Sequence, residues 1–401
     1  MQPLITPLDY TDPTVFAAER DNIFLKRWLF AGLADDLPNH QDFRCLEVCG
    51  IPVILQNFEG EIKAFNNVCS HRFARLHREP CGNRELRCPY HGWIYNAEGI
   101  PYAIPRRPLI AEITPETLPD YRLSRWHVRK FGPLLFIKKE FPDRPPPAHQ
   151  DLEMQFADFA GPLTNLTTAL GEVVERTDYT ISANWKIVVE NTLEGYHVDW
   201  VHPTTIKKLG LTGLVTSDSS SPAPAPEQMA TPDDFKPAGK EARGSQFTFT
   251  GENSAVHSPM PEAIAAKLDR VYSFLNRRPQ RLEGYRHFYL FPNFVFASTR
   301  GESFSLQILL PVDEKSTRLT SLLFATNGLG EMTRMETALK KQFYLSAAEF
   351  VRAIFAEDVG ICEEVQKGVG AAHLKGILSD EEERICGFQR ACADALGRTT
   401  S

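Results

Sequence analysis

The chain has 401 residues, enough for two domains with substantial hydrophobic cores. Its formal net charge of −7 argues against a nucleic-acid partner, and no apolar run approaches the length of a membrane span. The first ten residues lack the basic and apolar regions of a signal peptide. We therefore expect a cytoplasmic protein without a membrane partner, whose eight cysteines are thiols and not disulfides.

The first part of the chain combines a helix with a small β-domain. Residues 12–34 repeat apolar side chains at helical spacing, which predicts a helix. Beyond about residue 42, short alternating runs separated by glycine and proline predict an all-β domain with strands at 46–55, 61–68, 123–128 and 134–137. The proline-rich segment 141–147 is typical of a stiff linker. The helix before residue 40 is therefore expected to pack with the part that follows the linker.

After the linker, the sequence predicts an antiparallel sheet combined with long helices, so the fold class is α+β. Strands are expected at 170–181, 284–298, 303–311 and 318–325, and helices at about 185–199, 332–368 and 379–396. Ser379 and Glu382 form a capping box for the last helix. Residues 216–244 are dense in serine, proline and alanine; a plain mobile loop and a loop at the entrance to a site are both open interpretations.

The most informative stretch contains two Cys–His pairs, Cys69-x-His71 and Cys88-x2-His91. Two thiolates and two imidazoles are the ligands of a Rieske [2Fe–2S] centre, in which two histidines replace two cysteines on one iron. The alternative is a structural Cys2His2 zinc site, where the histidine pair usually follows the cysteine pair. Because the two residue types alternate here, the spacing favours the iron–sulfur cluster.

Residues 190–202 contain a second candidate metal site. Glu194 and His197 are three positions apart and share a face if the segment is helical. His197 and His202 are five apart, about 140° around a regular helix. Both can face one ion only if the helix is broken, and Gly195 within the segment and Pro203 after it favour such a break.

A third ligand is predicted near the end of the long helix. Asp358 falls on its apolar stripe, while Glu357, Glu363 and Glu364 fall mostly outside it. A carboxylate on a buried face is costly unless it is paired or bound to metal. Two histidines and one carboxylate form the facial triad of mononuclear Fe(II) oxygenases, with positions open for O2. The residues alone leave a second interpretation, in which Asp358 caps a helix break or meets a buried arginine.

Both ligand sets resemble those of the terminal oxygenase (alpha) subunits of Rieske non-haem iron oxygenases, the aromatic ring-hydroxylating dioxygenase family. The segment that ends at His202 is similar to the family's iron-binding helix, and residues 357–366 are similar to its late ligand segment. The resemblance implies that His197, His202 and Asp358 bind the mononuclear iron. It also implies that Glu194 is the acid that bridges the iron to the cluster domain, a position where the family more often has aspartate.

The resemblance covers most of the chain and implies its fold. A Rieske domain, residues 41–145, is expected to be inserted into a helix-grip catalytic domain made of residues 1–40 and 146–401. The implied cofactors are one mononuclear Fe(II) and one Rieske [2Fe–2S] cluster, the cluster held by Cys69, His71, Cys88 and His91.

The implied reaction needs O2, an organic substrate and two electrons. The sequence has no Gly-x-Gly-x-x-Gly fingerprint after a strand and no plant-type Cys-x4-Cys-x2-Cys run. Electrons are therefore expected from a separate flavin reductase fed by NAD(P)H, with or without a ferredoxin. The resemblance also implies a homotrimer, in which Glu194 meets the cluster of a neighbouring subunit, and it leaves a beta subunit open.

Two other classes of protein compete with this one. An electron carrier with an appended structural domain would need only about a quarter of this length. A structural protein with degenerate sites is disfavoured by the complete set of ligands. Iron content separates the oxygenase from the electron carrier, since an oxygenase binds about three Fe per chain and a carrier two.

The sequence says least about the substrate. A phenylalanine-rich sheet suits an aromatic pocket, although alternating phenylalanine is equally typical of an ordinary core; the residues are Phe288, Phe291, Phe294, Phe296 and Phe304. Arg286 and Arg300 could grip a carboxylate, but each is expected at the surface. We expect hydroxylation of an aromatic or similar hydrophobic substrate. Monooxygenation or demethylation of a polar methylated compound is the alternative.

Overall fold

The structure, a computed structural model, describes residues 2–206 and 245–398 and separates the chain into two compact units. The first, Phe24–Leu152, contains the predicted cluster ligands, and we call it the cluster unit. The second, Met1–Ile23 with Glu153–Ser401, contains the predicted iron ligands, and we call it the triad unit. The predicted loop over 216–244 lies outside the described residues.

The chain passes between the units after Ile23 and after Leu152, whereas we expected boundaries at residues 40 and 145. The early crossing has a simple cause. Strand β1 (Leu29–Leu33) is buried along its whole length and pairs antiparallel with β9 (Leu134–Lys139) of the cluster unit. Residues 24–40 therefore belong to that unit's sheet and not to the helical part of the other unit.

The helix predicted over 12–34 is correspondingly wrong in its second half. Helix α1 (Pro13–Glu19) passes into a π-helical turn, η2 (Arg20–Phe24), and the strand β1 follows. A short apolar run that is buried on both sides has the same composition in a helix and in a strand, so spacing alone could not tell them apart.

One seven-stranded antiparallel sheet, in the order β1-β9-β8-β4-β3-β2-β5, forms the cluster unit, with a separate hairpin β6-β7. The single strand predicted over 46–55 is a hairpin, because Cys49 and Gly50 adopt positive φ angles of 49° and 78° and turn the chain. The remaining bounds are β2 Asp42–Val48, β3 Ile51–Phe58, β4 Glu61–Asn66, β5 Cys81–Asn83, β6 Ile94–Tyr95, β7 Pro101–Ala103 and β8 Arg125–Phe131.

A second seven-stranded antiparallel sheet, in the order β10-β16-β15-β14-β13-β12-β11, forms the centre of the triad unit. The strand predicted over 284–298 is two strands, because the chain reverses at Phe291–Asn293. The other predicted strands are confirmed. The bounds are β10 Leu170–Ile181, β11 Gln246–Thr250, β12 Asn253–Ser258, β13 Tyr285–Leu290, β14 Phe294–Thr299, β15 Ser303–Asp313 and β16 Ser316–Thr326.

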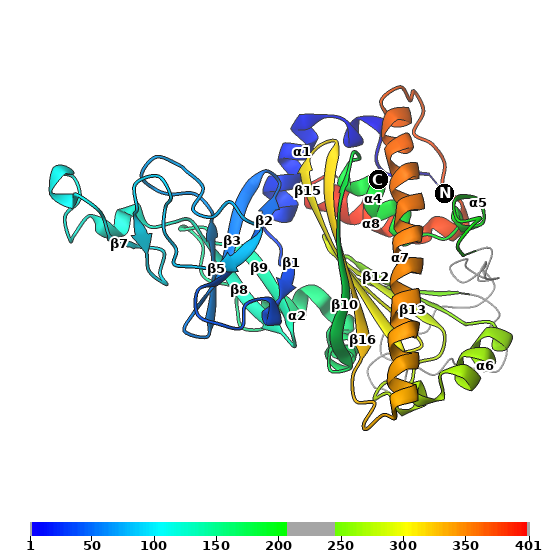
Figure 1. Cartoon of the computed structure of the whole chain (residues 1–401). Helices are drawn as coiled ribbons and strands as arrows, with labels where there is room; N and C mark the ends of the chain where they lie inside the picture. The colour runs from blue at the N-terminus through cyan, green and yellow to red at the C-terminus, as the bar shows by residue number, and fades with distance from the viewer. Residues whose placement is uncertain (1, 207–244, 399–401) are drawn as a thin grey trace. The chain divides into compact units, whose positions relative to one another are not determined.

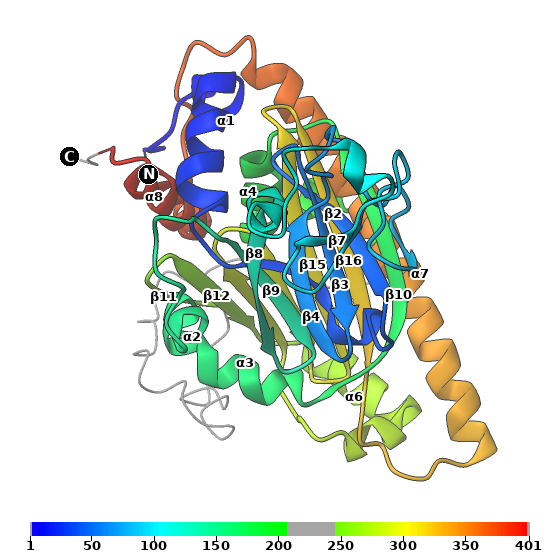
Figure 2. The same ribbon diagram turned by 90° about the vertical axis from the view of Figure 1, so that its left-hand side faces the viewer.

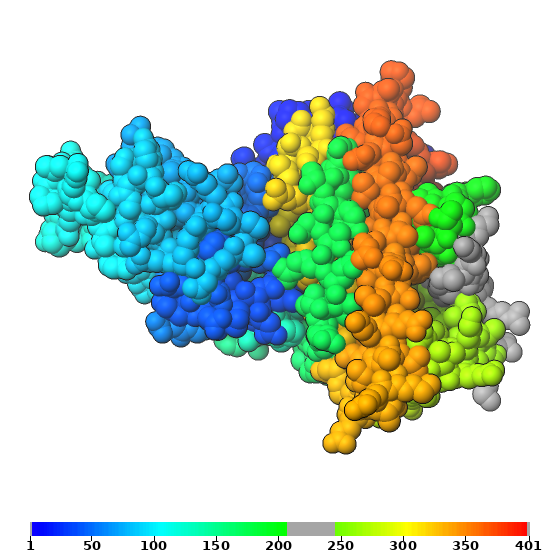
Figure 3. All heavy atoms as spheres, in the orientation of Figure 1, coloured from blue at the N-terminus to red at the C-terminus, as the bar shows by residue number. Residues whose placement is uncertain are grey.

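Two of the three helices predicted for the triad unit, over 332–368 and 379–396, are confirmed. Helix α7 (Arg334–Val369) starts from a capping box at Thr333, and the predicted capping box of Ser379 and Glu382 precedes α8 (Glu383–Ala395). Helix α7 lies beside β10 on the surface of this unit (Figure 3), where Arg352 pairs with Glu175. The other helices are α2 Asp151–Phe156, α3 Ala160–Thr167, α4 Trp185–Leu193, α5 Val198–Val201 and α6 Glu262–Val271. No helix in the described ranges is long and apolar enough to cross a membrane.

The two faces of this sheet differ, because successive side chains of a strand point to opposite sides. Helix α7 runs along one face (Figure 1), which we call the helix face; Tyr179 of β10 packs there on Phe355 of α7. Tyr289 of β13 packs on Phe388 of α8 on the same face. The neighbouring Phe288 points the other way and packs on Phe159, so we call that side the phenylalanine face.

Candidate functional site

The four predicted cluster ligands come together at the end of two loops of the cluster unit. The sulfur-bearing residues are enclosed, with Cys69 1% and Cys88 2% exposed, and both join the hydrophobic core. Gly92, at φ 74°, lets the second loop turn directly after His91, where a Cβ would meet the ring of Pro105. The rings of His71 and His91 lie 4.6 Å apart between centroids and reach the outer edge.

The donor atoms of these ligands fit a Rieske cluster. Nδ1 of His71 is buried without a hydrogen-bond partner in the described structure, although an orphaned ring nitrogen is costly unless something binds it. The ring is held in place by Trp93, which stacks on it at 4.9 Å. Burial raises the pKa of the Cys69 thiol above its usual range, so a thiolate there needs a metal cation beside it. The arrangement has two buried sulfurs inside and two imidazoles outside.

Tyr95 is a further residue of this site that the sequence did not indicate. Its hydroxyl lies 3.0 Å from Sγ of Cys69 and accepts the backbone N–H of Ser70 at 3.1 Å. Hydrogen bonds to the sulfurs are one of the factors that set the reduction potential of an iron–sulfur cluster.

The predicted iron ligands converge in the triad unit. The helix expected over 185–199 is interrupted: α4 ends at Leu193, Glu194 is extended, and α5 begins at Val198. This break brings His197 and His202 to one side, as their spacing required. Their ligand atoms and a carboxylate oxygen of Asp358 all lie within 4.8 Å of one another.

The distances among these atoms suit a single metal ion. Oδ1 of Asp358 lies 3.1 Å from Nε2 of His202 and 3.5 Å from Nε2 of His197. Nitrogen and oxygen ligands bind a first-row divalent metal at about 2.0–2.2 Å, so ligands at right angles are ~3 Å apart. Three residues on one side leave the other side open for O2 and substrate.

A carboxylate contacts each histidine at Nδ1, the ring nitrogen that faces away from the centre of the triad. Nδ1 of His197 contacts Glu194, and Nδ1 of His202 lies 2.8 Å from Oε2 of Glu357. A carboxylate accepts hydrogen bonds, so both histidines donate from Nδ1, which leaves Nε2 as the ring atom that faces the centre. Thr204 and Thr205 in turn donate to Glu357 and fix its orientation.

Asp358 is ionised in this setting. Burial alone would raise its pKa, but hydrogen bonds from His197, His202 and Asn191 lower it to about 2. Burial likewise acts to lower the pKa of His197, but Asp358 and Glu194 raise it to about 9. The site therefore attracts a cation strongly, either protons on the histidines or a metal ion that displaces them.

The structure also corrects several expectations. Asn191, whose Nδ2 donates to Oδ1 of Asp358 at 3.0 Å, was not singled out. Glu357 was set aside because it lies off the apolar stripe, yet its place beside Asp358 lets it reach His202 from behind. The expectation that Arg286 and Arg300 lie at the surface is wrong, since they are 5% and 6% exposed. Arg300 pairs with Asp269 and Glu302.

The phenylalanines do not form an aromatic pocket at this site. Phe288 and Phe296 are cross-strand partners, and Phe304, two residues off that row on β15, also packs on Phe296 on the phenylalanine face. Phe294 packs on Phe296, and Phe291 packs on Trp185 and Phe388 in the core. These phenylalanines therefore belong to an ordinary hydrophobic core, the second of the two interpretations.

Two family models match the chain. The Rieske [2Fe-2S] domain matches residues 27–114, and the catalytic domain of the ring-hydroxylating alpha subunit matches residues 169–398. The glycine betaine monooxygenase oxygenase subunit of Pseudomonas aeruginosa is 33% identical over 205 residues, which are 50% of this chain and 45% of that protein. The chain thus spans about half the length of this relative.

A longer match at lower identity is to the anthranilate 1,2-dioxygenase large subunit of Acinetobacter baylyi, with 26% identity over 344 residues, 80% of this chain and 68% of that protein. Among solved structures, the quaternary ammonium Rieske monooxygenase CntA aligns with a TM-score of 0.72 and 19% identity, over 98% of this chain and 94% of that one. This likeness shows that the fold is shared.

Proposed function

Because the chain belongs to the family of ring-hydroxylating alpha subunits and carries a Rieske [2Fe-2S] domain before the catalytic domain, we propose that it is the oxygenase component of an NAD(P)H-dependent system that hydroxylates a small, polar, N-methylated compound. The aromatic substrate that the sequence favoured becomes the second candidate.

When bound, the cluster would supply electrons one at a time, and an Fe(II) held by His197, His202 and Asp358 would supply open coordination positions for O2 beside the substrate. This chain's residues prepare the two sites for that chemistry. Glu194 and Glu357 hold His197 and His202 in the ligating tautomer, and Asn191 holds Asp358. Hydroxylation of an N-methyl carbon consumes one O2, two electrons and two protons and yields water and an N-hydroxymethyl group. That group leaves as formaldehyde, so the net reaction is demethylation.

The polarity of the sheet's helix face is the observation that carries the choice of substrate. Ser258, Tyr285, Thr299 and Ser303 form one cross-strand row on the side where α7 lies. Burial raises the pKa of Tyr285 to about 12, and the carboxylate of Asp358 adds to the rise, so this phenol lies near the triad. A phenol near the triad and a polar row behind it suit a polar substrate better than a hydrocarbon.

The charge of the site favours a cation. Glu194, Glu357 and Asp358 together carry three negative charges, and one Fe(II) leaves one of them uncompensated. Arg384 is nearby but 1% exposed, and its guanidinium is engaged by Ser254 and His287, so it is not presented to a substrate. A quaternary or protonated methylamine would gain from this field, whereas an aromatic carboxylate would not.

The comparisons support the same choice. The relative with 33% identity is named for glycine betaine, and the solved structure that aligns with a TM-score of 0.72 is named for quaternary ammonium compounds. The second candidate, an aromatic acid, is supported by the longer alignment to the anthranilate dioxygenase large subunit.

Oxygen uptake with a surrogate reductase decides between the candidates. The panel contains methylated amines and betaines, aromatic acids and aromatic hydrocarbons, and formaldehyde is measured in parallel. We expect uptake matched one to one by formaldehyde for an N-methyl compound. Uptake with anthranilate or benzoate and no formaldehyde would reject the proposal in favour of the second candidate.

The same proposal includes a ring of identical subunits, most simply a trimer, in which the cluster of one subunit faces the triad of the next. Two exposed surfaces of opposite charge support this ring. Beside the cluster histidines lie Arg72 and Phe73, the latter 78% exposed and held at an unusual φ of 61°. Beside Glu194 lie the acidic Asp199 and Trp200, which is 80% exposed. A basic, aromatic surface and an acidic, aromatic surface on one chain suit a head-to-tail contact.

A further inference from the structure

A small cavity of the cluster unit has a basic lining. It lies at the open end of the hairpin formed by β8 and β9, beside the proline-rich segment that follows β9, and its volume is about 250 Å³. Figure 2 shows this hairpin in the sheet of the cluster unit. Sites for drug-sized ligands measure ~300–1,000 Å³, so this cavity suits a smaller molecule. The described lining contains no carboxylate and five basic side chains, those of Lys26, His127, Lys138, Lys139 and Arg144.

Aromatic rings hold two of these cations in place. Nζ of Lys139 lies 5.3 Å from the centroid of the Trp126 ring, and the guanidinium carbon of Arg144 lies 4.5 Å from the centroid of the Phe141 ring. A cation over an aromatic face is oriented by the ring but keeps its full charge. Both charges are therefore preorganised beside the cavity.

The hydrogen bonds of Lys139 do not balance its charge. Its ammonium donates to Oγ of Ser124 and to the carbonyl oxygen of Arg125, which are neutral acceptors. Glu140, the next residue, pairs with the guanidinium of Arg125 at 2.6 Å. Burial lowers the pKa of Lys139 to about 8, although the charge of Glu140 opposes the fall. An ammonium buried among neutral groups is costly, and an anion bound beside it would reduce that cost.

The cations around the cavity also outnumber the carboxylates near them. Lys138 pairs with Asp151 at 2.6 Å, and the charge of Arg129 acts on the same carboxylate. Nη2 of Arg129 is buried without a hydrogen-bond partner in the described structure. Among the ion pairs of the described residues, none involves Lys139 or Arg144. An excess of positive charge therefore remains at this place.

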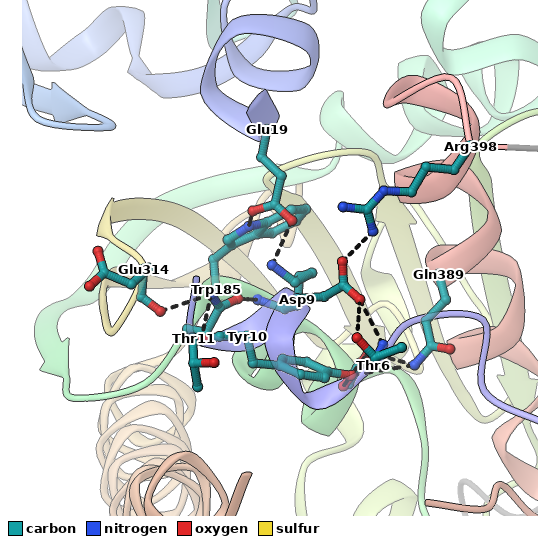
Figure 4. A network of polar contacts seen from close by, with 12 residues as sticks. Thr6, Asp9, Tyr10, Thr11, Glu19, Trp185, Glu314, Gln389 and Arg398 are labelled. Atoms are coloured by element: carbon teal, nitrogen blue, oxygen red, sulfur yellow. Dashed lines mark hydrogen bonds and ion pairs between the residues drawn. The ribbon is translucent and has the colours of Figure 1, made fainter. Parts of the chain in front are cut away.

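Buried charges of the triad unit, by contrast, are balanced within the chain. Glu19 pairs with Lys186 at 2.6 Å, with both side chains 1% exposed. Asp9 pairs with Arg398, and Figure 4 shows these two side chains pointing toward each other. At the cavity of the cluster unit the chain supplies the cations without enough carboxylates to match them, so a matching anion must come from outside.

The rest of the lining is apolar. It consists of Leu25, Phe141, Pro145 and Pro147. An inorganic ion would leave this surface unused, whereas an organic anion would bury apolar surface against it. The lining thus suits a molecule that has a charged group at one side and an apolar body at the other.

We propose that this cavity binds a small organic dianion, a phosphate ester or a dicarboxylate, with its charged groups beside Lys139 and Arg144 and its apolar body against Phe141 and the prolines. Two fixed cations attract two negative charges more strongly than one, so a dianion is favoured over a monoanion. The site lies in the cluster unit and contains none of the predicted metal ligands. It is therefore independent of the substrate and of the iron.

Calorimetric titration of the full-length protein, with both metal centres loaded, tests the proposal. The probes are phenyl phosphate and phthalate at about pH 7.5, where both are dianions, and they separate the two kinds of charged group. At constant ionic strength we expect saturable binding of at least one, with a Kd of ~1 mM or tighter. Phenol, which has the ring without the charge, should not bind. Inorganic phosphate should bind several-fold more weakly than phenyl phosphate, and equal affinity would contradict the role of the apolar wall.

Asp358→Ala excludes binding at the other site. Asp358 lies in the triad unit, so this variant should bind the probes with unchanged affinity. Loss of binding in Asp358→Ala would place the ligand at the triad and overturn the proposal.

Substitutions in the cavity locate the ligand. Lys139→Met and Arg144→Met each remove one cation, and each should weaken binding by about tenfold or more, whereas Lys139→Arg should retain most of the affinity. Lys130→Met is the control, because it removes an exposed lysine of the same hairpin beside its turn. The Rieske absorption counts the intact chains in every sample. Absence of saturable binding would overturn the proposal. So would equal affinity in wild type and both methionine variants of the cavity, or an equal loss in Lys130→Met.

Discussion

Nδ1 of His202 lies 2.8 Å from Oε2 of Glu357, and Glu357 directly precedes Asp358 on α7. Neighbouring residues of a helix point about 100° apart. One turn of α7 can therefore place one carboxylate in front of His202, where the metal binds, and another behind it. Thr204 and Thr205 complete this arrangement from the segment that follows α5.

Glu357→Gln tests this relationship. The amide cannot accept the Nδ1 proton as a carboxylate does, so His202 loses its preferred tautomer and orientation, and Fe(II) affinity should fall by about 10–100-fold. Competition with an Fe(II) chelator measures the affinity. Glu364→Gln is the control on the same helix, because Glu364 pairs only with the exposed Lys367 in the described structure. Equal affinity in both variants would mean that Glu357 does not support the ligand.

Removal of the third ligand should separate the two metal centres. We expect Asp358→Ala to keep the Rieske absorption and low-g EPR signals, to lose the mononuclear iron and to lose turnover, because the cluster ligands lie in the other unit. Iron analysis should fall from about three to about two Fe per chain. Cys88→Ser should have the converse effect and remove the cluster spectrum. A fully active Asp358→Ala protein with three Fe would place the third ligand elsewhere.

Glu194→Ala tests transfer of electrons between subunits. With Fe(II) in excess, the variant should hold about three Fe per chain and keep an intact Rieske spectrum, but pass electrons to the iron very slowly, since His197 loses the carboxylate that faces it. Stopped-flow reoxidation of the reduced cluster, with substrate and O2 present, measures the step. Wild-type rates would remove Glu194 from the path. A monomeric native mass of the wild type would remove the contact between subunits.

Tyr95→Phe should lower the reduction potential of the cluster. The phenol lies 3.0 Å from Sγ of Cys69, where it stabilises the more negative, reduced state. If the two oxidation states differ by ~1 kcal/mol in this hydrogen bond, the potential falls by about 40 mV for one electron. Spectroscopic redox titration measures the shift. Tyr121→Phe is a suitable control, since its ring packs on Trp93 and the described contacts of Tyr121 include none to a cysteine. An unchanged potential in Tyr95→Phe would contradict the assignment.

His77 should make the cluster unit sensitive to acid. Its side chain is 0% exposed, stacks on Phe43 and accepts a hydrogen bond from Arg84, and burial lowers its pKa to about 4. The unfolded chain then binds more protons than the folded one between about pH 6.5 and pH 4, so stability falls as the pH falls through this window. We expect this histidine to cost about 2 kcal/mol of stability between pH 7 and pH 5. Urea unfolding, followed by the Rieske absorption, should show that extra loss in wild type and not in His77→Asn.

The sequence by itself indicated which residues to expect as metal ligands, because most of them lie in short motifs, where the spacing between residues is set locally along the chain. Cys69, His71, Cys88 and His91 occupy two short loops, and the spacing of His197 and His202 already required the broken helix that the structure contains. Asp358 is far from the two histidines in the sequence, but its own helix identifies it, because a carboxylate on an apolar stripe is unusual. The long helices and most strands could be predicted from the periodicity of apolar residues, which is also a local property of the sequence.

Only the tertiary structure decided what surrounds those ligands. The phenylalanines of β13, β14 and β15 alternate in the sequence with histidine, tyrosine, valine, alanine and serine, and nothing local says which set faces α7, because that depends on the helices packed on each side. The role of Glu357 depends on a histidine 155 positions earlier. The candidate ligands can be recognised from their spacing along the chain. The polarity of the site and the residues that support the ligands depend on contacts that exist only once the chain has folded.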